Sequence, residues 1–108
     1  MTQARQSLTV AVELAQKVQR VKAFDSNMTG IMGMQSTGQI AVQDLQKAAS
    51  ELVFAIRNGR SVQDKLAALK AVEGALSNVM VLGIISQEEI HPYDRLTEEI
   101  FWLIDMES

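Results

Sequence analysis

Residues 61–85 read SVQDKLAALKAVEGALSNVMVLGII, and this stretch decides the fold that we predict for the chain. At helical spacing its large apolar side chains fall on one stripe, namely Val62, Leu66, Leu69, Val72, Leu76 and Val79. Such a stripe is typical of a helix that packs on other helices. Ser61 is a candidate N-cap, and Gly83 is a candidate for the glycine that follows a helix C-terminus. We therefore expect one long helix between these two residues.

The same stretch also has a second face of small residues, namely Ala67, Ala71, Gly74, Ala75 and Asn78. Short side chains allow a neighbouring backbone to approach more closely than large ones do. The helix should therefore touch partners on two sides. This makes it the expected central helix of the domain.

Another helix is predicted immediately before the central one, over residues 38–57. Its apolar stripe comprises Ala41, Leu45, Ala49, Leu52 and Ile56. Ser36 and Gln39 have the spacing of a capping box at its start, and Asn58-Gly59 is a termination signal at its end. Because only about three residues then connect the two helices, they should form an antiparallel hairpin.

The first helix is expected over residues 6–23, with an apolar stripe of Val10, Leu14, Val18 and Val21. Lys17, Arg20 and Lys22 make it basic, which is compatible with a small helical DNA-binding regulator. No interleaved aromatic residues or glycine motif accompany these cations. Nucleic-acid binding is therefore the alternative interpretation, and direct contact with nucleic acid is not the main prediction.

Methionine is concentrated in the segment 25–38, DSNMTGIMGMQSTG, where we expect a loop. Its apolar residues are Met28, Ile31, Met32 and Met34. Methionine often fills irregular gaps in a core, which is one explanation. The other is an adaptable contact surface, and on that hypothesis these four residues are predicted to bind a partner protein.

A last helix is predicted over residues 92–106, after a capped turn at 86–90 that starts with Ser86 and Glu89. Its buried arc comprises Tyr93, Leu96, Ile100, Leu103 and Ile104. Trp102 and Met106 fall on the opposite side, with Phe101 at the edge of the arc. Because a terminal helix normally keeps that side polar, these three residues are the predicted interface of a homodimer.

Charge is distributed unevenly along the chain, whose net charge is −3. The segment 88–108 contains seven of the 13 acidic residues and one basic residue, Arg95, so it carries −6. An acidic face can attract a basic protein surface, and Glu98 and Glu99 are its predicted partner-binding residues. Solvated helix positions are the simpler explanation.

Composition points to one small helical domain spanning residues 1–108. The chain lacks cysteine and has a single proline, Pro92, with few aromatic residues. A sulfur-ligated zinc site and a cysteine nucleophile are excluded. There is no apolar run of signal-peptide or membrane-span type, so we expect a soluble, cytoplasmic protein without disulfides.

No combination of residues predicts catalysis or a cofactor. His91 is the only histidine, and Ser86 and Asp94 near it lack the strand-turn-helix context of a serine nucleophile. Glu88 and His91 match half of a di-iron carboxylate motif, but no second matching pair of core glutamates is evident. We therefore expect neither an enzyme nor a metal or cofactor site.

The turn Leu82-Gly83-Ile84-Ile85-Ser86, which ends a long helix just after a capped hairpin, resembles one in small all-helical bacterial quorum-sensing antiactivators. The resemblance covers about residues 51–86. It implies a dimeric protein that binds a LuxR-type transcription factor and blocks its dimerisation or DNA binding. The extra C-terminal helix with Pro92 departs from the simpler members, and no single functional residue is carried over.

The sequence as a whole thus predicts an all-α, compact four-helix domain with a central helical hairpin, dimeric and non-enzymatic. Its expected role is regulation by protein–protein contact, most concretely as an antiactivator of a LuxR-type transcription factor. Besides a DNA-binding regulator, a helical accessory subunit or secretion chaperone is the remaining alternative.

Overall fold

The computed structural model describes residues 2–21 and 37–107, with side chains from residue 6 onward. These residues form four helices, α1 (Thr2–Gln19), α2 (Thr37–Arg57), α3 (Val62–Val81) and α4 (Ile90–Asp105). The described part of the chain contains no strand. The predicted all-α four-helix domain is therefore confirmed.

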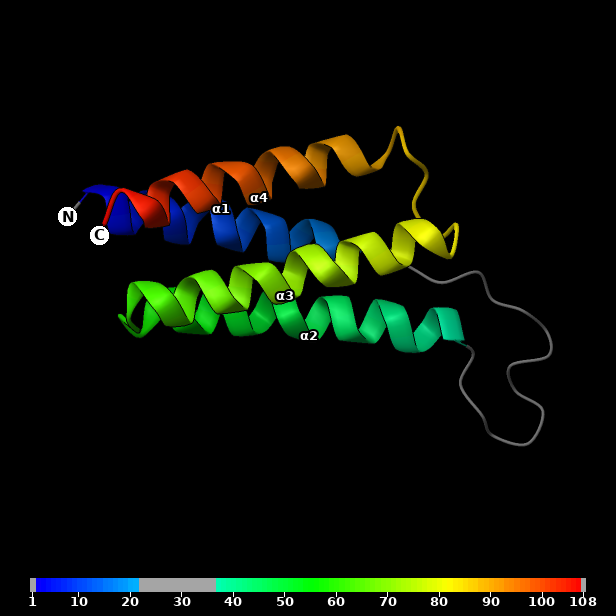
Figure 1. Cartoon of the computed structure of the whole chain (residues 1–108), viewed down its shortest axis with the longest axis horizontal. Coiled ribbons are helices and arrows are strands. Elements are labelled where there is room, and N and C mark those ends of the chain that lie inside the picture. The colour runs from blue at the N-terminus through cyan, green and yellow to red at the C-terminus, as the bar shows by residue number, and fades with distance from the viewer. Residues whose placement is uncertain (1, 22–36, 108) are drawn as a thin grey trace.

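The helices form an antiparallel bundle in which the chain reverses direction at each connection (Figure 1). Contacts join α1 to α2, α2 to α3, α3 to α4 and α4 back to α1, whereas the diagonal pairs of described helices make none. Each helix therefore has two neighbours. The α2–α3 hairpin is present as predicted, but α3 is no more central than the other three helices.

The core is built from the inward face of every helix. Among its fully buried side chains are Leu14, Val18, Leu45, Leu52, Leu69, Val72, Leu76, Val79, Ile100 and Ile104. Burying each of these from water stabilises the fold by about 1.5–3 kcal/mol. The large apolar stripe predicted for α3 is thus core from Leu69 onward, while Val62 and Leu66 are half-buried at its start.

The small-residue face of α3 was wrongly predicted to pack against a neighbouring helix. Ala67, Ala71, Gly74 and Asn78 are exposed, and only Ala75 is half-buried. A Cβ added to Gly74 would meet no atom within 4 Å. The physical reason is the ring arrangement, because two neighbours and the core cover only the inward part of each helix.

The short α2–α3 connection is set by two consecutive caps. Gly59 adopts a left-handed conformation with φ 64°, and the N–H of Arg60 donates to the carbonyl of Ala55 at 3.0 Å. Ser61 then accepts a hydrogen bond from the N–H of Asp64 at 3.1 Å, as predicted. Together they end one helix and begin the next within residues 58–61.

The C-terminus of α3 also has the predicted glycine cap. Gly83 has φ 77°, and the N–H of Ile84 donates to the carbonyl of Val79 at 2.9 Å. The N–H of Gly83 donates to the carbonyl of Met80 at 3.0 Å. These paired bonds satisfy two carbonyls that a helix end would otherwise leave without partners.

Helix α4 begins at Ile90, two residues earlier than predicted. Ser86 and Glu89 form the expected reciprocal capping box, with both hydrogen bonds at 3.1 Å, and the N–H of Ile90 donates to the carbonyl of Ser86. Pro92 therefore falls in the first turn, where its missing N–H would have had no helical partner. For this reason the proline does not delay the helix.

Helix α1 was predicted to start at residue 6 and to end at residue 23. It begins four residues earlier, because no glycine or proline interrupts its start, and it ends at Gln19. Two hydrogen bonds that each span three residues end the helix. They run from the N–H groups of Arg20 and Val21 to the carbonyls of Lys17 and Val18. The last two residues of the predicted helix lie outside the described residues.

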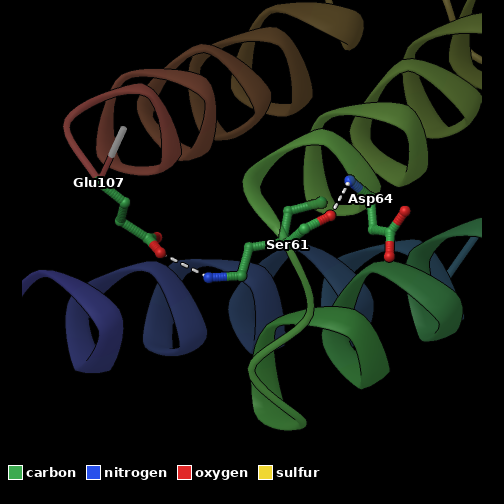
Figure 2. Close-up of polar contacts among 4 residues, drawn as sticks. Ser61, Asp64 and Glu107 are labelled. Atoms are coloured by element: carbon green, nitrogen blue, oxygen red, sulfur yellow. Dashed lines mark hydrogen bonds and ion pairs between the residues drawn. The ribbon is translucent and has the colours of Figure 1, made fainter.

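One buried ion pair ties the end of α4 to the start of α3 (Figure 2). Lys65 Nζ lies 2.5 Å from Glu107 Oε1, and the two side chains are 6% and 18% exposed. The other oxygen, Glu107 Oε2, is buried and has no hydrogen-bond partner among the described residues. The pair joins residues 42 positions apart at the bundle end that contains the α2–α3 turn.

Candidate functional site

The outer side of α4 carries an unusual group of exposed apolar side chains. Phe101, Trp102 and Met106 are 39%, 55% and 57% exposed. The Phe101 and Trp102 rings meet edge to face, with centroids 5.5 Å apart and planes at 77°. Phe101 therefore packs against part of Trp102, and more than half of the Trp102 residue stays exposed.

Two acidic side chains precede this group on the exposed side of α4. Glu98 and Glu99 are exposed, and neither forms an ion pair within residues 6–21 and 37–107. Both are therefore available for a cation from another molecule. We call Phe101, Trp102, Met106, Glu98 and Glu99 together the α4 face.

A groove flanks the α4 face on each side. The groove toward α3 has a volume of about 360 Å³ and is lined by Glu73, Asp94, Thr97, Glu98 and Phe101. The groove toward α1 has a volume of about 370 Å³ and is lined by Gln6, Thr9, Val10, Glu99 and Leu103. Among the described residues that line them, both grooves contain acidic side chains of α4 and no basic ones. The arrangement suits an apolar anchor accompanied by positive charge.

The opposite end of α4 contains a cluster around its capping box. Two hydrogen bonds from Ser86, the backbone one first, lower the pKa of Glu89 below its ordinary value of 4.5. Burial, followed by the charge of Glu89, raises the pKa of Tyr93 above 10.0, while nearby Arg20 acts in the opposite direction. The Lys17 ammonium lies 5.8 Å from the centre of the Tyr93 ring.

This cluster bears on the alternative of nucleic-acid binding. Lys17 is one of the three cations on which the nucleic-acid alternative rests. It is half-buried and contacts an aromatic ring within the bundle. Arg20 lines a small groove beside Glu89 and Tyr93. Lys22 lies outside the described residues. Lys17 and Arg20 therefore face an acidic and aromatic neighbourhood of the same chain, which does not favour phosphate binding.

Several predicted partner-binding residues cannot be placed. Met28, Ile31, Met32 and Met34 all lie outside the described residues, as does Ser36 of the proposed α2 capping box. Their assignment stays a prediction. Of the proposed contact residues, the structure places Glu98, Glu99, Phe101, Trp102 and Met106, and it brings them together on one helix.

The residues considered for catalysis lie in or beside the capping box at the start of α4. Ser86 is engaged in the capping box, and Glu88 and His91 are exposed at the start of α4. No group of three or more potential metal ligands gathers in the described ranges. Within the same ranges, no helix has both the length and the apolar character to cross a membrane.

Sequence reasoning missed a third exposed aromatic residue, Phe54, and the buried Lys65. Phe54 is 56% exposed on α2, whereas Lys65 is 5% exposed on α3. Helical spacing alone indicates that Phe54 is exposed and that Lys65 is buried. Phe54 lies off the stripe that Leu52 and Ile56 define, and Lys65 precedes Leu69 by one helical turn on the buried side.

Comparison of the chain with protein-family models, with curated proteins and with solved structures gave no significant match.

Proposed function

We propose that this protein is a non-enzymatic regulator that acts by binding another protein through the α4 face. The observation that carries the proposal is the exposure of Trp102, 55%, beside Glu98 and Glu99, which form no ion pair with any described residue. Large aromatic residues dominate the binding energy of protein interfaces, and charges at the rim mainly accelerate association. The α4 face combines both features.

The chemistry of the α4 face defines its partner. The partner presents an apolar pocket or side chain that covers Trp102, together with lysine or arginine residues opposite Glu98 and Glu99. In its most concrete form the partner is a LuxR-type transcription factor, and the protein is an antiactivator that keeps this factor from dimerising or holding DNA. This form rests on the resemblance of residues 51–86 to the quorum-sensing antiactivators.

A fluorescence titration tests partner binding directly, because Trp102 is the only tryptophan of the chain. Addition of a tryptophan-free partner should shift the emission of Trp102 to shorter wavelength as the ring leaves water. Trp102→Glu should abolish binding in a label-free assay. Ile40→Glu is the matched control, because Ile40 is 47% exposed on α2 and lies outside the α4 face.

The charge component is tested separately. Glu98→Lys with Glu99→Lys should slow association at low salt and leave dissociation nearly unchanged, because exposed charges steer encounter and salt screens them. If the double variant associates at low salt as fast as the parent does, Glu98 and Glu99 do not lie at the contact surface.

The antiactivator form needs its own experiment. Purified protein should release a LuxR-type regulator from promoter DNA in a mobility-shift assay, and Trp102→Glu should not. Met32→Asp with Met34→Asp tests the predicted contribution of the methionine segment in the same assay. If the parent protein leaves every such regulator of its host bound to DNA, the antiactivator assignment is wrong, while binding of another protein remains testable by fluorescence.

A further inference from the structure

A groove between α1 and α2 has the opposite character to the α4 face. Its volume is about 360 Å³, and it is lined by Val12, Ala15, Ser50, Val53, Phe54 and Arg57. Phe54 is 56% exposed at its border. The walls are therefore mainly apolar, and an aromatic ring is available for contact.

The charge of this groove is positive. Arg57 belongs to its lining, and the Arg60 guanidinium lies 5.6 Å from the centre of the Phe54 ring. Among the described residues, no acidic side chain lines the groove and none forms an ion pair with Arg57. We call Val12, Ala15, Val53, Phe54, Arg57 and Arg60 the basic groove.

The basic groove and the α4 face of one molecule cannot meet. The described parts of α2 and α4 are diagonal in the bundle and make no contact. The two surfaces are nevertheless complementary, since one combines apolar walls with arginines and the other combines an aromatic anchor with glutamates. We propose that the α4 face of one molecule docks into the basic groove of a second copy of this chain.

Docking of α4 on the basic groove is favoured over pairing of two α4 faces. Face-to-face pairing would bring Glu98 and Glu99 of both copies together at the same interface, and like charges facing one another are destabilising. Docking into the basic groove places the same glutamates near Arg57 and Arg60 instead. The residues predicted for a homodimer interface, Phe101, Trp102 and Met106, therefore contact a different surface of the second copy.

Nucleic acid is a less suitable occupant. Two arginines neutralise only about two phosphates, whereas duplex binders typically neutralise about 6–10. The rest of the described lining is apolar except for Ser50, and the chain as a whole has a net charge of −3. An acidic, apolar protein segment suits the groove better, and α4 is such a segment in this chain.

Head-to-tail docking has a distinctive consequence. When the contact is made in one direction only, each molecule in a pair still has one unused basic groove or one unused α4 face, so association can continue beyond two copies. A two-fold dimer would stop at two. The average mass in solution should therefore rise continuously with protein concentration, and it should fall with salt because the exposed charges are screened.

Two variants test the inference, each with one surface disabled. Trp102→Glu removes the aromatic anchor and leaves the basic groove intact, whereas Phe54→Glu with Arg57→Glu reverses the groove and leaves the α4 face intact. All four positions of change, including the control Ile40→Glu, are exposed, so circular dichroism should remain that of the parent. Sedimentation velocity gives the mass distribution.

Each variant alone should sediment as a monomer, whereas an equimolar mixture of the two should form a complex of two chains. The mixture contains one working α4 face and one working groove, which is sufficient for a single head-to-tail contact. Ile40→Glu should associate as the parent does. This mixing experiment uses the protein alone, so its outcome is independent of whether any partner protein binds the α4 face.

Three outcomes would overturn the inference. A parent that remains monomeric at high micromolar concentration excludes self-docking. A dimer that Phe54→Glu with Arg57→Glu leaves intact and that Trp102→Glu abolishes shows pairing of two α4 faces. Duplex DNA binding that is lost in the groove variant, together with a mixture of variants that stays monomeric, assigns the groove to nucleic acid.

Discussion

The buried pair of Lys65 and Glu107 allows a quantitative test of how the two ends of the chain are held together. Lys65→Met removes the cation and leaves the Glu107 carboxylate without a partner in a site where its Oε2 is already unsatisfied. Breaking a buried ion pair by removing one member costs about 3–5 kcal/mol. Because Glu107 is 18% exposed and can be partly hydrated, we expect the low end, about 3 kcal/mol.

Replacing both members should be far less costly than replacing one. Lys65→Met with Glu107→Leu removes both charges and fills the space with apolar groups, and such replacements are often neutral or stabilising. We expect the double variant to lie within about 1 kcal/mol of the parent. The double-mutant cycle with the two single variants should then give a coupling of about 2 kcal/mol or more.

Urea unfolding followed by circular dichroism at pH 7 measures all four proteins. Lys70→Met is the matched control, because Lys70 is exposed on the same helix and should change the unfolding free energy by less than about 0.5 kcal/mol. High salt should change the cost of Lys65→Met little, because a buried pair is poorly screened. Additive single variants, or a cost of Lys65→Met equal to that of Lys70→Met, would refute a buried, coupled pair.

The remaining predictions concern the core, one helix position and two titrations. Leu69→Ala and Leu76→Ala should each lower the unfolding free energy by about 2–5 kcal/mol, and denaturant midpoints near the parent value would contradict their burial. Gly74→Ala should raise it by about 0.5–1 kcal/mol, because the added methyl group meets no atom and the helix gains propensity; a loss would mean that the exposed face is packed. Since the folded pKa of Glu89 is lowered, its contribution is present above the unfolded pKa and lost as pH falls through the folded value, so Glu89→Gln should flatten the acid limb of stability against pH; an unchanged acid limb would count against the capping box. Tyr93 is the only tyrosine, and its raised pKa should appear as ultraviolet ionisation above pH 10.0 that shifts downward in Glu89→Gln, whereas ionisation at the free-tyrosine value would exclude its burial.

Helix existence and most caps could be predicted from sequence because their causes are local. Ser61, Gly83 and the Ser86–Glu89 pair act on backbone groups within a few residues of themselves. The position of α4 was missed because a proline is tolerated in a first turn that a preceding cap has already organised. The sequence shows where the proline is. It does not show whether the proline falls in the first turn, where an N–H would have no helical partner.

Features that depend on which helices are neighbours were less accessible. The small face of α3 is exposed because each helix meets only two others, and helical spacing does not give the number of neighbours. Exposure of Trp102 and Met106 could be predicted, because they lie opposite the buried arc of their own helix. The basic groove could not, because it requires Val12 of α1 to lie beside Phe54 of α2.

The capped turn between α2 and α3 also has a kinetic consequence. Left-handed Gly59 and the Ser61 cap hold the two longest helices together through a connection of very few residues, so their contacts cost little loop-closure entropy. The α2–α3 hairpin should therefore form early, and α1 and α4, which pair at opposite ends of the sequence, should dock late. On this basis, weakening the turn slows folding, whereas weakening the contact between α1 and α4 mainly accelerates unfolding.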